Sequence, residues 1–297
     1  MKGFIKLSLL SGCLVIAFKS NAQQIATTPD TTQGVKVAVP ATAKTAVPKP
    51  TAKRVVVKKP KPIRTEMSGG LRLNSNGWGL FVDKGWVRSE EKNRDYFYNI
   101  RLAQIELDEV RHPKEVKRSN NPSDNSPMAF AYGKINNFYA LKLGYGARRL
   151  IAGKPEHGTV AIHWVYLGGF SAGLVKPYYL EVQSVKGGQA GPVETIKYSD
   201  SNQRKFLGLR EDNGTANYII GSAGFGKGLG EIGFNPGIHL KTGLHFDFAP
   251  SKTMKMAVEA GVSGELYAKK VELMALQKAY PYTVSVYASF QFGKRWQ

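Results

Sequence analysis

The segments that most constrain the fold are those in which apolar and polar residues strictly alternate. In the last of them, Tyr282 to Phe292, every even position is Tyr, Val, Ala or Phe, whereas the odd positions are Thr, Ser, Tyr and Gln. Because successive side chains of a β-strand point to opposite faces, this strand has one wholly apolar face. Too little chain follows it to cover that face, so the apolar side needs a core, a partner or lipid beside it.

The same alternation recurs through the second part of the chain. It predicts strands at 70–83, 95–107, 136–148, 158–169, 173–184, 237–249, 254–268 and 282–293. Each segment has about the 9–11 residues with which a tilted strand crosses a bilayer, and single-chain outer-membrane barrels have an even number of strands. The sequence therefore predicts an all-β protein, a transmembrane up-and-down antiparallel barrel of about eight strands. Ten strands are the alternative, with a further pair formed around "PVETIKYS".

Alternation alone does not say which face is inside, because a soluble lipocalin-like barrel would turn its apolar face inward. Here the polar faces are rich in Gly, Ser and Thr beside charged residues, which is typical of a crowded lumen. We therefore expect the apolar faces to meet lipid. The residues expected inside, as a charged network that fills the lumen, are Arg101, Lys142, His163, His239, Lys241, His245, Asp247, Glu259 and Glu265.

Two other roles for this interior set are weaker alternatives. The three histidines with the nearby acids could form a metal or acid–base site. An eight-stranded barrel has room for side chains rather than for a channel, so conduction is not expected. The interpretation adopted is structural pairing, with no catalytic residue, no cofactor and no metal.

The N-terminus has the pattern of an exported protein. Residues 1–22 have a basic start, an apolar run and the small-x-small end "SNA", which predicts a secretory signal peptide. The alternative is a lipobox, "LSGC", that ends at Cys13. Because Cys13 is the chain's single cysteine, cleavage after Ala22 leaves an exported protein without disulfides.

Residues 23–67 are rich in Pro, Thr, Ala, Val and Lys and contain no aromatic residue. Such a segment cannot bury a core, so it predicts a disordered periplasmic tether ahead of a barrel at 68–297. The alternative for the tether is electrostatic attachment to an anionic cell-wall polymer or lipid surface.

The connections between the predicted strands differ strongly in length. "GGFSAG" around Phe170 and "APSK" after Phe248 are predicted as tight turns at one end, whereas 185–235 forms the longest connection at the other. Outer-membrane barrels have short periplasmic turns and longer external loops. Residues 108–135 conflict with this order, because they are too long for the periplasmic turn expected there. They predict either a short plug or a different strand count.

Several stretches together resemble a family of outer-membrane β-barrels from Bacteroidota. They are "GLRLNSNGWGLFVDKG", "RHPKEVKRSN", "GKINNFYALKLGYGARRLIAGK", "GLVKPYYLEV", "FNPGIHLKTGLHFDF" and "FQFGKRW", and they cover about residues 68–297. The resemblance implies an outer-membrane barrel and carries no catalytic residues. The closing stretch, with Phe290, Phe292 and Trp296, resembles the signal read by the barrel-assembly machinery, although Gln297 leaves the final aromatic penultimate.

Two glycine-rich motifs in the long connection have a plainer interpretation. "GSAGFGKG" nearly matches a P-loop, but Gly228 stands where a Ser or Thr should bind magnesium. The overlapping "GLGEIG" is followed by "FNPG", which cannot continue the helix of a dinucleotide-binding unit. We interpret both as parts of an external loop.

The expected function is non-enzymatic and lies in envelope structure, adhesion, or envelope assembly or secretion. The expected partners are outer-membrane lipid and lipopolysaccharide, which basic loops such as "RHPKEVKR" would contact, and the barrel-assembly machinery. Nucleic acid is not expected for an exported chain. The alternatives are a barrel enzyme that modifies lipid A and a soluble periplasmic barrel that binds a small ligand.

Overall fold

The structure is a computed structural model that describes residues 64–87, 99–119, 129–153, 159–248 and 253–296. The predicted signal peptide and the tether up to residue 63 lie outside these ranges. Among the described residues, no helix is long and apolar enough to span a membrane.

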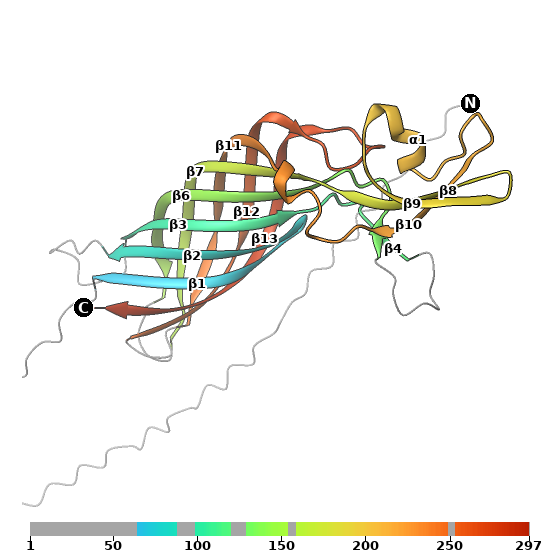
Figure 1. Cartoon of the computed structure of the whole chain (residues 1–297). Helices are drawn as coiled ribbons and strands as arrows, with labels where there is room; N and C mark the ends of the chain where they lie inside the picture. The colour runs from blue at the N-terminus through green and yellow to red at the C-terminus, as the bar shows by residue number, and fades with distance from the viewer. Residues whose placement is uncertain (1–63, 88–98, 120–128, 154–158, 249–252, 297) are drawn as a thin grey trace, which may run out of the picture. The chain divides into compact units, whose positions relative to one another are not determined.

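Eight antiparallel strands close into a barrel (Figure 1). They are β1 (Thr65–Asn74), β2 (Gly77–Val87), β3 (Asn99–Val110), β6 (Asn136–Ala152), β7 (Ala161–Pro177), β11 (Gly233–Asp247), β12 (Met254–Val271) and β13 (Tyr280–Trp296). Each strand pairs with its predecessor in this series, and β1 pairs with β13 from Thr65↔Trp296 to Asn74↔Tyr287. The predicted all-β, up-and-down barrel of eight strands is confirmed.

The apolar faces of the barrel strands point outward. On β13, Phe290 and Phe292 are 51% and 63% exposed, whereas Ser289 and Gln291, which alternate with them, are fully buried. The other strands repeat this distribution, with Leu, Ile, Val and Met side chains exposed around the wall. An apolar surface of this extent surrounding a polar interior is unstable in water and matches the hydrocarbon of a bilayer. The barrel is therefore built to span a membrane.

Aromatic side chains form a girdle near each end of this outer wall. Their rings are amphipathic and favour the boundary between lipid and water. The exposed members at the end where the barrel chain begins and ends are Trp86, Trp164 and Trp296, and those toward the opposite end are Trp78, Tyr280 and Tyr282.

The segment predicted as one strand at 70–83 is a hairpin of two. β1 and β2 meet at a two-residue turn, Ser75 and Asn76, inside "NSNG". Glycine is required directly after the turn, because a Cβ at Gly77 would lie 1.8 Å from the carbonyl oxygen of Glu109. β1 also begins at Thr65, so the tether predicted at 23–67 ends earlier than its composition indicated.

The turn predicted at "GGFSAG" does not exist. β7 continues through it, and a Cβ at Gly169 would lie 1.9 Å from the carbonyl oxygen of Leu143 on β6. The glycines therefore allow two strands to approach closely rather than reverse the chain. The predicted strands 158–169 and 173–184 become one long strand and the start of a separate sheet. This error and the missed hairpin offset each other, so the count of eight was still right.

These corrections change which connections share an end of the barrel. We call the end where β1 starts and β13 finishes the terminal end, and the opposite one the loop end. The loop end carries the residues between β1 and β2, β3 and β6, β7 and β11, and β12 and β13. The described part of 108–135 therefore lies at the same end as the longest connection, which removes the conflict seen in the sequence.

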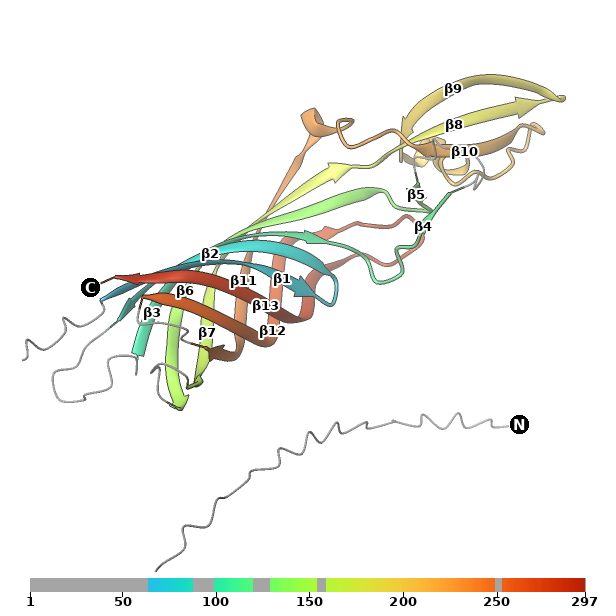
Figure 2. The same ribbon diagram turned by 90° about the horizontal axis from the view of Figure 1, so that it is seen from below.

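Part of the loop end folds into a small substructure, which we call the head. It contains a sheet of order β10 (Ala216–Ser222), β8 (Tyr179–Lys186) and β9 (Gln189–Lys197), the one-turn helix α1 (Gln203–Phe206), and two 3-10 turns, Asp200–Asn202 and Leu229–Glu231 (Figure 2). The short pair β4 (Lys117–Arg118) and β5 (Phe130–Ala131) adjoins it.

The head has a hydrophobic core of its own. The buried members are Phe130, Ile135, Leu180, Val182, Phe206, Leu207 and Ile219. "PVETIKYS" is largely in β9, which pairs with β8 and not with a barrel strand. The alternative of a ten-stranded barrel is therefore wrong, although the segment does form a strand.

Candidate functional site

The interior of the barrel is filled by polar and charged side chains, which we call the lumen network. Eight of the nine residues expected inside are buried, namely Lys142, His163, His239, Lys241, His245, Asp247, Glu259 and Glu265. Arg101 was assigned wrongly. It alternates with Ile100 and Leu102, which are fully buried, so its side chain lies on the outer face near the terminal end.

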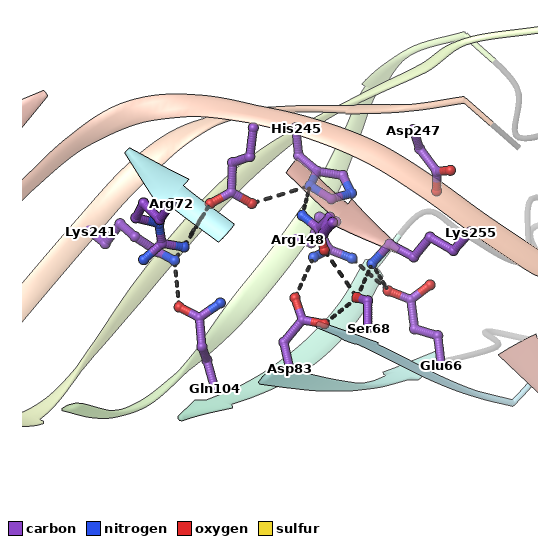
Figure 3. A network of polar contacts seen from close by, with 12 residues as sticks. Glu66, Ser68, Arg72, Asp83, Gln104, Arg148, Lys241, His245, Asp247 and Lys255 are labelled. Atoms are coloured by element: carbon purple, nitrogen blue, oxygen red, sulfur yellow. Dashed lines mark hydrogen bonds and ion pairs between the residues drawn. The ribbon is translucent and has the colours of Figure 1, made fainter. Parts of the chain in front are cut away.

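Glu66 organises the part of the network nearest the terminal end (Figure 3). Its carboxylate accepts hydrogen bonds from Arg148 at 2.5 Å, from Lys255 at 2.8 Å and from Arg295 at 3.4 Å. Arg295 also pairs with Asp247 on β11. Arg148, Asp247, Lys255 and Arg295 lie on four different strands, β6, β11, β12 and β13, and Glu66 lies on β1. The cluster therefore joins distant parts of the barrel wall.

A second group lies around Glu259 on β12. His245 lies 3.1 Å from one oxygen of its carboxylate, and the hydroxyl of Tyr287 donates to the other at 3.0 Å. Lys241 is 3.5 Å from Glu259 and donates to Gln104 at 2.6 Å across the lumen. The carboxylate, the phenol and the ammonium thus have polar partners in this group, as buried polar groups usually do. The imidazole has them only at Nδ1, since Nε2 of His245 has no hydrogen-bond partner among the described residues.

Arg72 connects this second group to β3. Its guanidinium pairs with Glu106 and lies 3.8 Å from Glu259. It is held between the rings of Phe81 and Tyr287, at 4.6 and 4.7 Å from the two centroids. Contact of this kind with two aromatic rings is favourable for a guanidinium and holds the cation inside the lumen.

A third group closes the lumen toward the loop end. Lys142 donates to Asp108 at 2.6 Å and also pairs with Glu265, whose carboxylate accepts a 2.5 Å hydrogen bond from Tyr267. Above these groups an apolar cluster includes Phe138 and Val110, and the rings of Phe138 and Tyr267 pack edge to face.

Opposite charges are almost balanced in the network. Among the residues that the structure describes, the inward-facing buried groups are six cations, Arg72, Lys142, Arg148, Lys241, Lys255 and Arg295, and seven carboxylates, Glu66, Asp83, Glu106, Asp108, Asp247, Glu259 and Glu265. Paired charges of this density leave the barrel as a filled plug of side chains rather than an open pore.

The inward-facing histidines lie beside other lumen side chains. His239 lies 3.2 Å from the hydroxyl of Ser171, and the rings of His163 and His245 are 5.9 Å apart. Within the described ranges, no group of three or more His, Cys, Asp or Glu side chains is placed to hold a metal ion. What the arrangement supports is structural pairing.

More than half of the network was not predicted. The missed members include Glu66, Ser68, Arg72, Asp83, Gln104, Glu106, Asp108, Arg148, Lys255, Gln291 and Arg295. Glu66 was missed because it was assigned to the tether, and Asp83 because the first hairpin was taken as one strand. Arg148, Lys255 and Gln291 lie within predicted strands, on faces already taken as polar, so applying the alternation to every second residue would have found them. Extending it beyond the predicted bounds would have reached Ser68 and Arg295.

The aromatic residues predicted as an assembly signal lie together on the outer face of β13. Phe290, Phe292 and Trp296 are all exposed there.

No protein-family model matches the chain, and no curated protein sequence matches it. Among solved structures, the chain is similar to Ail, the attachment invasion locus protein of Yersinia pestis, in complex with the heparin analogue sucrose octasulfate. That match has 9% identity and a TM-score of 0.36, and it covers 80% of this chain and 100% of that one.

Two further solved structures are similar at the same level. Neisserial surface protein A matches with 10% identity and a TM-score of 0.30, covering 79% of this chain and 96% of that one. The N-terminal β-barrel domain of Pseudomonas aeruginosa OprF matches with 8% identity and a TM-score of 0.29, covering 80% and 100%. TM-scores this low do not extend the likeness to function or to any site.

Proposed function

We propose that the protein is an outer-membrane barrel that holds its head at the cell surface for a non-enzymatic role in adhesion or envelope structure. The observation that carries this proposal is that the barrel and the head differ in structure. The lumen is filled by paired charges, whereas the head has a separate core and an exposed surface. A filled barrel suits an anchor, and a folded loop structure suits contact with a partner.

The orientation follows from the connections. Outer-membrane barrels have short turns on the periplasmic side and longer loops outside. The head and the longest connection are at the loop end, and both chain ends of the barrel are at the terminal end. We therefore orient the loop end outward and the terminal end toward the periplasm.

The proposal that the protein is not an enzyme rests on the placement of its histidines and acids. His163, His239 and His245 are buried on the lumen side of their strands, away from lipid. His239 contacts Ser171, and His245 contacts Glu259. A lipid A-modifying barrel enzyme would need such groups at the outer rim, beside its substrate. Outward-facing Phe290, Phe292 and Trp296 support, in the same proposal, recognition by the barrel-assembly machinery.

Two single-cysteine variants test location and orientation together. Ala190→Cys places a thiol on the exposed β8–β9 hairpin, and Ala152→Cys places one at the terminal end of β6. The expected result is a membrane-fraction protein that migrates differently when unheated. Intact cells should label only Ala190→Cys with a membrane-impermeant maleimide, whereas lysed cells should label both.

Three outcomes would contradict this proposal. Recovery in the soluble fraction with unchanged migration would favour a soluble ligand-binding barrel. Labelling of Ala152→Cys alone on intact cells would reverse the orientation. An altered acyl or phosphate pattern in lipid A from a deletion strain would favour the enzyme.

A further inference from the structure

A cavity of about 210 Å³ lies at the loop end, on the outside of the barrel wall. Its floor consists of outward-facing residues near the ends of three barrel strands, Glu109 on β3, Tyr139 on β6 and Lys176 on β7. Its walls come from the head, including Tyr178 and Phe225. We call it the rim pocket.

Cations outnumber acids in the lining of the rim pocket. The cations are Arg111, Lys117, Lys134, Lys176 and Lys227, and the acids are Glu109 and Glu115. Arg111 donates to Glu109 at 2.9 Å, and Lys134 donates to Glu115 at 2.7 Å. Two cations are therefore neutralised within the pocket, and three lysines remain without a carboxylate partner among the described residues.

Lys176 is the most informative of these lysines because its residue is only 2% exposed. Its ammonium donates to the carbonyl oxygen of Phe225 and lies 4.1 Å from the centroid of that ring. A buried ammonium held by one carbonyl and one ring lacks the opposite charge that normally offsets its desolvation. An anion in the pocket would supply that charge.

Two further features of the lining suit a sugar-linked anion. Burial raises the pKa of Tyr178, which keeps its hydroxyl protonated; the oxygen accepts a 3.3 Å hydrogen bond from the backbone N–H of Ala131. Lys117 and Lys227 are exposed and reach the pocket from two different connections, Lys117 from β4 between β3 and β6, and Lys227 from the residues between β10 and β11. Two exposed ammonium groups and one buried ammonium group can surround the several oxygens of a phosphate.

The position of the rim pocket along the barrel wall indicates the class of its ligand. On the faces that form its floor, the next outward residues toward the terminal end are Leu107 and Leu141, which are 48% and 39% exposed. Trp78, a member of the loop-end girdle, donates to Glu109 at 2.7 Å. The rim pocket therefore begins where the apolar wall ends, at the level of lipid headgroups.

We propose that the rim pocket binds a phosphate group on the saccharide headgroup of an anionic glycolipid in the leaflet around the loop end. This inference rests on the proposed outward orientation of that end. The cavity is smaller than the roughly 300–1,000 Å³ of sites that hold whole drug-sized ligands. Its size therefore suits one phosphate with part of its sugar, while the acyl chains lie along Leu107 and Leu141.

The test uses the full barrel protein in detergent, titrated with lipopolysaccharide and with the same material after enzymatic dephosphorylation. The variant K117Q/K176Q/K227Q removes the three unpaired lysines. The matched control, K186Q/K269Q/K270Q, removes the same charge from exposed lysines outside the pocket, two of them on β12 near the loop end. Heat-dependent migration reports whether each variant is folded.

We expect the pocket variant to bind phosphorylated lipopolysaccharide about tenfold more weakly or worse, because charge-assisted contacts to phosphate are lost. The control should bind as the parent does, and dephosphorylation should weaken the parent to the level of the pocket variant. If K176Q prevents folding, the double variant K117Q/K227Q is measured instead, with an intermediate loss expected.

Equal binding by the pocket variant and the control would overturn the proposal, as would a parent that does not distinguish the two lipopolysaccharides. Tighter binding of a soluble sulfated oligosaccharide than of lipopolysaccharide would overturn the proposal that the bound anion belongs to a lipid. Inorganic phosphate should compete only at high concentration, and full displacement at equal concentrations would show that the sugar adds nothing. Cysteine labelling at Ala190 is independent of these results, so a failure here is distinguishable from a failure of the proposed orientation.

Discussion

At the scale of single residues, Glu66 shows how much the barrel depends on charges paired in its interior. One carboxylate accepts hydrogen bonds from Arg148, Lys255 and Arg295, and all four side chains are at most 1% exposed. A buried charge cluster adds little stability compared with an apolar core of the same volume. Removing one member nevertheless lowers the free energy of unfolding strongly, because the remaining charges stay buried without a partner.

We therefore expect Glu66→Gln to destabilise the folded barrel by about 3 kcal/mol. The exposed pair of Glu194 and Lys205 provides the comparison, since Glu194→Gln should cost less than about 1 kcal/mol. Denaturant titration in detergent, followed by tryptophan fluorescence, measures both. Equal midpoints for the two variants would mean that the Glu66 cluster is not a major source of stability.

At the scale of elements, β6 and β7 approach each other through glycines rather than through side-chain packing. Gly169 on β7 pairs with Gly144 on β6. A Cβ added to Gly146 would lie 2.0 Å from the carbonyl oxygen of Tyr166. These glycines make room in the lumen for larger neighbours such as Leu167 and His239.

Gly169→Ala should weaken the pairing of β6 with β7, because its Cβ would overlap the backbone of Leu143. We expect a loss of about 1–3 kcal/mol, as for other overpacked sites. The control is Gly264→Ala on β12, where no heavy atom lies within 4 Å of the added Cβ. The temperature at which unheated migration is lost should fall for the first variant only, and a similar fall in both would contradict this account.

At the scale of the whole molecule, the barrel combines an apolar wall, a filled lumen and a separate head. The side chains of each part have different surroundings. Exposed apolar side chains meet lipid, inward charges meet one another, and the head buries its own core around Phe206 and Leu180. Because the core of the head is separate from the lumen network, we expect that substitutions in the head leave the barrel unchanged.

A filled lumen predicts that the reconstituted protein does not conduct ions. The network crosses the barrel from the Glu66 group to the Lys142 group and is closed by Phe138 and Tyr267 above. Recordings in planar lipid bilayers should show no discrete current steps across a range of voltages. Regular steps that scale with salt concentration would show that the network opens.

The lipid-facing pattern was predictable from the sequence, whereas the strand boundaries were not. His245 and Glu259 lie in strands with one clean apolar face, so their inward orientation was predicted correctly. Arg101 lies in a strand that has Ile100 and Leu102 inside and Ile105 outside, so hydrophobicity did not distinguish the two faces. The rim pocket was not predicted, because its lysines come from loops and strand ends that share no periodicity.

The sequence by itself determined that this chain forms membrane-crossing strands, because a two-residue period of apolar side chains is a local property that any stretch of β-strand displays. Only the tertiary structure decided where each strand turns and which charges meet. Glu66 and Lys255 are separated by 189 residues, and Glu66 and Arg148 by 82. Closure of β1 on β13 brings such residues into one lumen, and no local pattern records that geometry.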